Sequence, residues 1–133
     1  MTLYAGPELD KTQANFAPLT PVSVLKRTER VYPDLPAQIH GNICRNWGEV
    51  ADRCKRLASA LSKRGVGKGD TVALIAPNIP EALECALAIP MLGAVLNANN
   101  VRLDAATLGL FSSTARPRYC SLIPSSPPWR ERR

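Results

Sequence analysis

Residues 65–107 read GVGKGDTVALIAPNIPEALECALAIPMLGAVLNANNVRLDAAT, and this stretch decides the fold. Gly67–Asp70 predicts a tight turn, because glycine adopts turn conformations that other residues avoid. The segment that follows, Thr71–Ala76, is a continuous apolar run, which is typical of a strand buried on both faces. A buried strand of this kind indicates a sheet covered by helices.

The second half of the stretch predicts a helix and another strand. Asn78 and Pro80 are signals for a helix start, and Pro90 should kink or end that helix because proline lacks a backbone donor. Gly93–Leu96 begins the next strand. Strand, helix and strand joined by short links form a βαβ unit, normally with parallel strands and a right-handed crossover. The predicted fold class is α/β.

Two further helices and a hairpin are expected upstream. Thr20 followed by Pro21 predicts a helix over 21–32, and its inward residues should be Val22, Leu25 and Val31. Residues 37–45 contain a short strand, a Gly-Asn turn and a return strand, which predicts a hairpin.

Asn46 and Glu49 form a variant of the capping box at the start of the next helix. That helix has an apolar stripe at spacings of four, three and four residues, with two alanines beside it: Val50, Cys54, Leu57, Leu61, Ala51 and Ala58. Its cations, Arg53, Lys55, Arg56, Lys63 and Arg64, lie largely off the stripe and favour a solvated face over a phosphate site. Gly65 is placed to end the helix in a left-handed conformation.

The net charge of +6 is concentrated near the end of the 133-residue chain. Residues 108–133 hold five arginines and one glutamate, so they carry +4, and residues 1–107 carry only +2. Nucleic-acid binding is therefore not required to explain the main body. No secretory signal and no apolar run of membrane-spanning length is present.

The four cysteines, at 44, 54, 85 and 120, are scattered without metal-site spacing. We interpret them as reduced thiols of a cytoplasmic protein, with Cys54 and Cys85 acting as small hydrophobic residues on helix faces.

The ordered set of these motifs resembles the N-terminal subdomain of adenylate-forming enzymes, the superfamily of acyl-CoA synthetases, luciferases and peptide-synthetase adenylation domains. Asn46-Trp47-Gly48-Glu49 is similar to the family's aromatic helix start, and the resemblance covers about residues 14–107. The ending LNANNVRLD resembles fatty-acid and medium-chain CoA ligases and acyl-activating enzymes. The resemblance implies an incomplete N-terminal subdomain of the ligase fold.

The resemblance also implies an activity. Relatives use ATP, Mg²⁺ and coenzyme A to convert a fatty or other carboxylic acid into an acyl-adenylate and then an acyl-CoA. They need a phosphate loop, an adenylate-binding segment and a catalytic lysine on a lid, and in the family all three lie beyond the stretch matched here. No catalytic, cofactor-binding or metal-binding residue is therefore assigned to this chain, and we expect it to bind no cofactor by itself.

Four features were weighed as sites and given structural roles instead. Gly65–Gly69 precedes a strand and does not join a strand to a helix, so it lacks the context of a nucleotide loop. His40 has no second ligand or nucleophile near it in sequence. Arg102 and Asp104 match family positions and are expected to hold the loop after the strand.

The resemblance stops at residues 108–111, and the following segment is rich in Pro, Ser and Arg, so 108–133 is expected to be disordered. When each codon is begun at the third base of the preceding one, plausible codons for 111–129 can encode His-Gly-(Gln/Glu)-Ala-Lys-Val-Leu, the continuation expected from the family. Our hypothesis is a frameshift or a mispredicted splice near codons 108–112. The alternative is a basic tail that contacts RNA or an acidic membrane.

The sequence thus predicts three regions: an irregular lead-in over 1–19, a partial AMP-binding domain over 20–107 and a tail over 108–133. The expected function is that of a truncated, inactive member of the acyl-CoA ligase family. The alternative is a non-catalytic interaction fragment, or short isoform, that docks on a full-length relative. The partner alternatives are such a relative and self-aggregation, with no nucleic acid and no membrane span.

Overall fold

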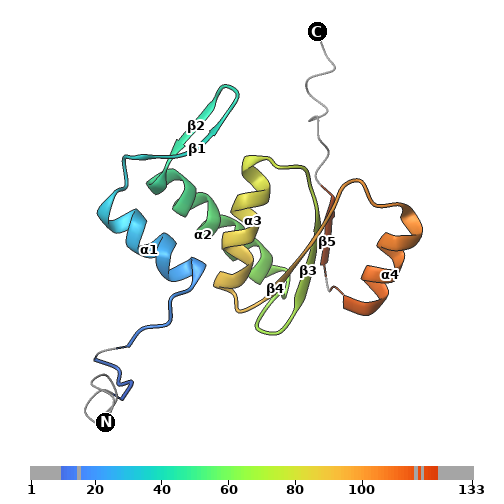
Figure 1. The fold of residues 1–133 in the computed structure, drawn as a ribbon, viewed down its shortest axis with the longest axis horizontal. Coiled ribbons are helices and arrows are strands. Elements are labelled where there is room, and N and C mark those ends of the chain that lie inside the picture. The colour runs from blue at the N-terminus through green and yellow to red at the C-terminus, as the bar shows by residue number, and fades with distance from the viewer. Residues whose placement is uncertain (1–9, 15, 116, 118, 123–133) are drawn as a thin grey trace, which may run out of the picture.

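The computed structural model describes residues 10–14, 16–115, 117 and 119–122. Along the chain, Figure 1 shows four helices and five strands in these ranges: α1 Pro21–Val31, β1 Pro36–His40, β2 Ile43–Asn46, α2 Trp47–Lys63, β3 Thr71–Ile75, α3 Pro80–Met91, β4 Val95–Asn99, α4 Ala105–Ala115 and β5 Tyr119–Leu122. The described residues before α1 contain no helix or strand. None of the helices in these ranges is both long enough and apolar enough to cross a bilayer.

Helix α1 begins as predicted. The Thr20 hydroxyl accepts a hydrogen bond from the backbone N–H of Ser23, whose side chain accepts one from the N–H of Thr20. Leu25 is buried and Val22 is half-buried, but the prediction for Val31 is wrong, because 49% of Val31 is exposed. At 100° per residue, Val31 lies about 120° around the helix from Leu25, so it points away from the buried face.

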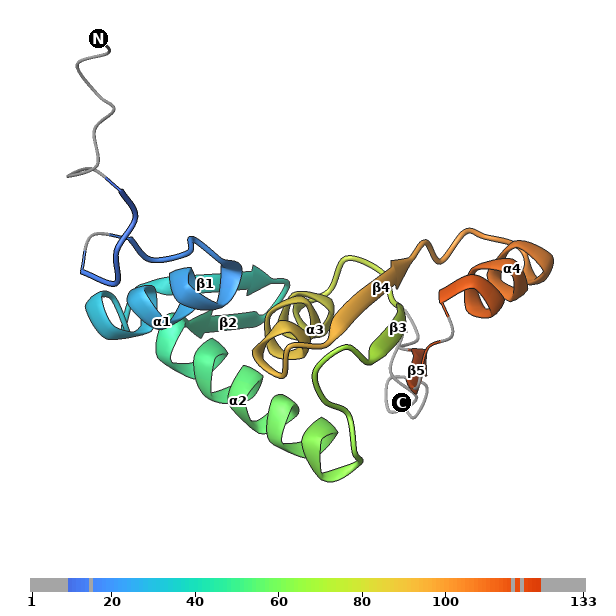
Figure 2. The same cartoon turned by 90° about the horizontal axis from the view of Figure 1, so that it is seen from below.

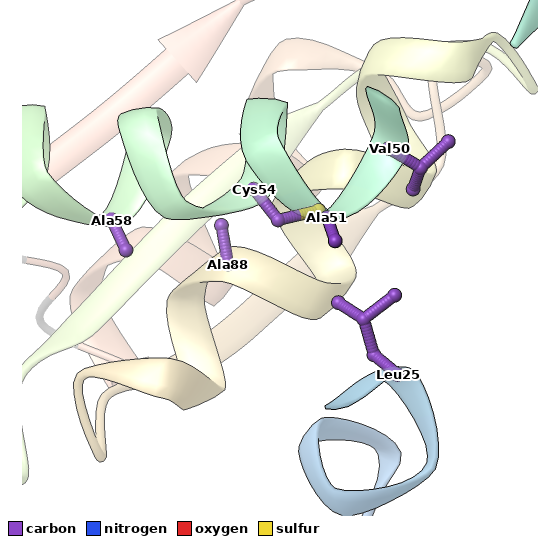
Figure 3. Packing of buried hydrophobic residues seen from close by; sticks show 6 residues of the cluster. All are labelled: Leu25, Val50, Ala51, Cys54, Ala58 and Ala88. Carbon is purple, nitrogen blue, oxygen red and sulfur yellow. The ribbon is translucent and has the colours of Figure 1, made fainter. Parts of the chain in front are cut away.

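The predicted hairpin and the helix after it are both confirmed. β1 and β2 pair antiparallel, and the Asn46 side chain accepts from the N–H of Glu49 at 2.8 Å while Glu49 accepts from the N–H of Asn46 at 2.9 Å. The predicted stripe on α2 is buried except for Leu57, which is half-buried. Figure 3 shows Leu25 of α1 pointing toward this stripe, and Ala88 of α3 lying between Cys54 and Ala58.

The sheet is parallel and has the order β4-β3-β5. The predicted βαβ unit is therefore confirmed, with β3 central and its three middle residues buried. A second apolar cluster joins α2, α3, β3 and β4 through Leu61, Val66, Val72, Ile89 and Ala94. Figures 1 and 2 show α3 and α4 on opposite sides of the sheet, which is the arrangement of doubly wound folds.

Helix α3 differs in detail from the prediction. Ile79 is its N-cap, with no side-chain hydrogen bond, and Pro90 lies inside the helix, which ends one residue later at Met91. A proline so near the C-terminal end removes a single ladder bond, and the N–H of Leu92 still reaches the carbonyl of Ile89 at 3.1 Å.

The structure also differs from the expectation of disorder after residue 108. α4 extends to Ala115, and Tyr119–Leu122 forms β5 alongside β3. The composition of 108–133 obscured a proline-free segment, because Pro117 is the first proline after α4 begins. Asp104 starts the helix by accepting hydrogen bonds from the N–H and hydroxyl of Thr107. The prediction for 123–133 lies outside the described residues.

The turn before β3 is held against the turn before β4. The N–H of Gly69 donates to the carbonyl of Gly93 at 3.0 Å, and the N–H of Val95 donates to the carbonyl of Asp70 at 2.8 Å. Gly93 has a φ of +70°, and a Cβ there would lie 3.3 Å from Cγ of Lys68. Gly67, in the same turn, has open space around the position of a Cβ.

Gly93→Ala should therefore destabilise the fold by about 1–2 kcal/mol, the cost of a left-handed conformation for a non-glycine residue. Gly67→Ala is the matched control and should be neutral or slightly stabilising, since alanine restricts the unfolded chain. Urea unfolding followed by far-UV circular dichroism measures both changes. Equal effects of the two substitutions would contradict the geometry described here.

Candidate functional site

The most highly organised polar cluster lies where the hairpin, α2 and α3 meet. The Glu84 side chain on α3 is only 6% exposed, and its Oε1 accepts from Arg45 Nη1 of β2 and from Arg53 Nε of α2, each at 2.6 Å. Glu81, one turn earlier on α3, lies 3.6 Å from Arg45 and is 38% exposed. A single buried carboxylate thus joins two arginines from separate elements.

A buried glutamine completes the cluster. Gln38 of β1 donates from Nε2 to the carbonyl of Pro80 at 3.2 Å, and its Oε1 accepts from Arg45 at 3.4 Å. The hydrogen bond to Glu84 raises the pKa of the Arg53 guanidinium above its ordinary value. No buried side-chain N or O atom in the described residues is left without a hydrogen-bond partner.

This cluster holds elements in place and lacks the groups for catalysis. Its cations are arginines, which do not lose protons in proteins, and Glu84 is occupied by both of them. Arg53 had been assigned to a solvated face, and this is corrected by its contact with Glu84. The signal in the sequence was a glutamate on an otherwise apolar helix, which needs a buried partner.

The other cations of α2 remain on the surface as predicted. Lys55 pairs with Glu29 of α1, and Arg56 and Arg64 donate to carbonyls of their own helix. None of these groups converges with another on a common point, so the solvated-face interpretation holds for them.

The glycine-rich turn has the structural role expected of it. Gly65 ends α2 with a φ of +83°, and Gly69 has a φ of +86°. The N–H groups that could face an anion are already used: Gly67 donates to the Asp70 carboxylate at 2.8 Å, and Gly69 donates to Gly93. A phosphate would have to displace these bonds and would meet the Asp70 carboxylate.

The remaining sequence candidates do not come together. His40 is exposed at the end of β1, and no side-chain hydrogen bond or ion pair among the described residues involves it. Asp104 caps α4, and the hydrogen bonds from Thr107 lower the pKa of its carboxyl. Arg102 is exposed, and its backbone N–H donates to Asn100 at 2.9 Å. No group of three or more metal-ligating side chains occurs in the described ranges.

A cleft of about 620 Å³ opens at the carboxyl ends of β3 and β4, the edge at which open α/β sheets bind ligands. Its floor is apolar, and polar side chains at its rim come from the loops after the strands: Asn78, Asn99, Asn100 and Arg102. It contains no carboxylate, histidine or thiol. The cleft has room for a ligand and lacks an acid, a base or a nucleophile.

Comparison with known proteins identifies the family. Residues 25–124 match the family model of the AMP-binding enzymes. The match includes most of the predicted domain and extends beyond residue 107 through β5. The chain therefore belongs to the AMP-binding enzyme family.

Among curated relatives, an acetate/butyrate–CoA ligase of Arabidopsis thaliana, described as peroxisomal, is 47% identical over 106 residues, which are 80% of this chain and 19% of that protein. An acetate–CoA ligase of Humulus lupulus is 44% identical over 101 residues, which are 76% of this chain and 18% of the relative. The chain thus spans about a fifth of the length of the curated relatives it matches.

Solved structures agree on the fold. A putative long-chain-fatty-acid CoA ligase of Rhodopseudomonas palustris superimposes with a TM-score of 0.75 at 29% identity, over 78% of this chain and 26% of that one. The N-terminal subdomain of NpsA from Klebsiella oxytoca gives 0.73 at 27% identity, over 80% and 28%. The α/β fold described here is therefore part of the N-terminal subdomain of adenylate-forming ligases, as the sequence predicted.

Glu84→Gln should destabilise the chain by about 3 kcal/mol, because the two arginines then lack their shared charge. Glu81→Gln removes the same charge from an exposed position on the same helix and should cost less than about 1 kcal/mol. Urea midpoints of the two variants give the comparison. Equal losses would show that burial of Glu84 is not the cause.

Thiol reactivity should follow burial. Burial raises the pKa of the Cys54 thiol to about 11, and Cys85 is shifted in the same direction, whereas Cys44 is exposed on β2. At pH 8, maleimide should modify Cys44 first and Cys54 last, since the thiolate is the reactive form. Peptide mapping by mass spectrometry measures this order. Early labelling of Cys54 would show that the α2–α3 interface opens.

Proposed function

We propose that the chain derives from an enzyme that activates a carboxylic acid. In that reaction the carboxylate attacks the α-phosphate of ATP, releasing pyrophosphate and forming an acyl-adenylate. The thiol of coenzyme A then displaces AMP and forms the acyl-CoA. The observation that carries this proposal is the 47% identity to an acetate/butyrate–CoA ligase over 106 residues. The acid is a fatty or other carboxylic acid.

We further propose that this chain alone is inactive and holds no nucleotide, Mg²⁺ or coenzyme A. Its glycine-rich turn uses its N–H groups internally. The cleft at the ends of β3 and β4 has no group that could act as acid or base. Both observations support a scaffold without the parts that carry out adenylation.

The purified 133-residue chain should give no ATP–pyrophosphate exchange with acetate or butyrate above a blank without protein. A full-length relative, such as the Arabidopsis ligase, serves as the positive control. Exchange that depends on the acid and on the 133-residue chain would contradict the proposal, since it would require adenylation by residues assigned here to structure.

A frameshift or a mispredicted splice near codons 108–112 remains our explanation for residues after 108. The shifted frame encodes Ala-Lys-Val-Leu from the codons of residues 116–120, which overlap the start of β5. An apolar strand in both frames is consistent with the family match continuing to residue 124. This agreement supports the proposal without requiring residues 123–133 to have a function.

Sequencing of genomic DNA and transcript across codons 105–135 tests it directly. The expected result is a family continuation in the second frame, leading to a Ser/Thr/Gly-rich phosphate loop. Expression of the corrected reading frame should then restore acid-dependent exchange. Intact DNA without such a continuation would refute the frameshift.

An interaction fragment is the second candidate, favoured by exposed apolar side chains at both ends of the fold. Ile39 on the hairpin is 75% exposed, and Leu110 and Phe111 on α4 are 64% and 43% exposed. A pull-down with a full-length relative distinguishes this candidate from an inert product. Binding that is lost when all three residues are replaced by serine would favour it.

The compartment proposed from the cysteine pattern is the cytoplasm. Several relatives carry the word peroxisomal in their descriptions, which concerns those proteins. Cell fractionation with antibodies to the chain decides between the two compartments.

A further inference from the structure

Strand β4 is an edge of the sheet in the described part of the chain. The N–H of Val95 donates toward β3, to the carbonyl of Asp70. Because the backbone groups of successive strand residues point to opposite sides, those of Asn97 and Asn99 also face β3. The N–H and C=O groups of Leu96 and Ala98 therefore face outward, away from the sheet.

This edge lacks the features that keep other edges from pairing. Natural edge strands carry lysine, proline, a bulge or an inward-pointing charge. β4 has the sequence Val-Leu-Asn-Ala-Asn, with no ionisable residue and no proline. Its register with β3 runs from Val95 to Asn99 without a shift, so no bulge twists the edge away. Val95 is 55% exposed.

We propose that β4 pairs with β4 of a second copy of this chain, antiparallel and about a two-fold axis at Asn97. Leu96 then lies opposite Ala98 of the other copy, and Ala98 opposite Leu96. Each of these two residue pairs exchanges two N–H···O bonds, because both partners direct their backbone groups across the interface. All the outward groups of Leu96 and Ala98 are satisfied by this register.

Charge favours a second copy at this surface. The chain carries a net +6, so most contacts between two copies would bring like charges together. β4 itself is uncharged and opposes only amide, methyl and isopropyl groups. The side chains match as well: Leu96, which packs against the cluster under α3, meets Ala98 on the same face, and Val95 meets Asn99 on the other. The contact is isologous and therefore closes at a dimer.

The axis at Asn97 gives a sharp test. The two Asn97 side chains form a non-hydrogen-bonded cross-strand pair, whose Cβ atoms lie about 4.5–5.5 Å apart. Asn97→Lys or Asn97→Asp therefore places two like charges opposite each other, and each variant alone should dimerise at least about fivefold more weakly. An equimolar mixture of the two variants should regain a dimer containing one chain of each.

The experiment uses the full chain in light scattering with size-exclusion chromatography, and native mass spectrometry identifies the mixed dimer. Asn78→Lys and Asn78→Asp make the same charge changes at an exposed position outside β4 and should leave the dimer unchanged. Recovery in the mixture shows that both Asn97 variants are folded well enough to pair.

A chain that stays monomeric at all concentrations overturns the proposal. So does self-association that neither Asn97 substitution weakens, because it would use another surface. Binding to a full-length relative without any homodimer would assign the edge to a different partner and also overturns it. None of these outcomes bears on ATP–pyrophosphate exchange, so this test and the test of the proposed function fail separately.

Discussion

The carboxylate of Glu84 is the contact on which the arrangement of the first half of the chain depends. The hairpin has little apolar surface in the core, since Ile39 is 75% exposed and Ile43 is 36% exposed. Its position is set by Arg45, which reaches Glu84, and by Gln38, which reaches the first carbonyl of α3. Buried ion pairs contribute little net stability, but they strongly disfavour arrangements that separate the charges. We infer that Glu84 selects the orientation of the hairpin, and that the apolar contacts of α2 and α3 supply most of the stability.

Local signals explain how much of the fold could be predicted. Thr20 with Pro21, and Asn46 with Glu49, are caps formed by residues three or fewer positions apart, and both helices begin where these pairs occur. The contacts of Glu84 could not be predicted in this way, because Arg45 and Arg53 lie 39 and 31 positions away. The segment after residue 108 was misjudged for a different reason. Average composition was applied to a segment whose first part has a capped start, provided by Asp104, and no proline before position 117.

The prediction that this chain carries no catalytic site rested on the resemblance, and the geometry is consistent with it. The glycine-rich turn that looked most like a phosphate loop uses its donors to join β3 to β4, so its composition reflects the closeness of Gly69 and Gly93. The cleft at the carboxyl ends of the strands could be anticipated from the βαβ topology. Its lack of acid and base groups could not, because the loop residues that line it were not recognisable as neighbours from their order along the chain.

The central position of β3 has a consequence for the order in which the sheet can form. Val72 pairs with Leu96 and with Tyr119, so its two neighbours follow it by 24 and 47 residues. A ribosome that adds about 5–20 residues per second therefore exposes the most apolar strand for seconds before either neighbour has been synthesised. Contacts of such long sequence separation also form slowly, because closing the intervening loop costs entropy before any bond is gained. The strand that is most deeply buried in the finished fold is thus the segment most in need of protection while the chain is being made.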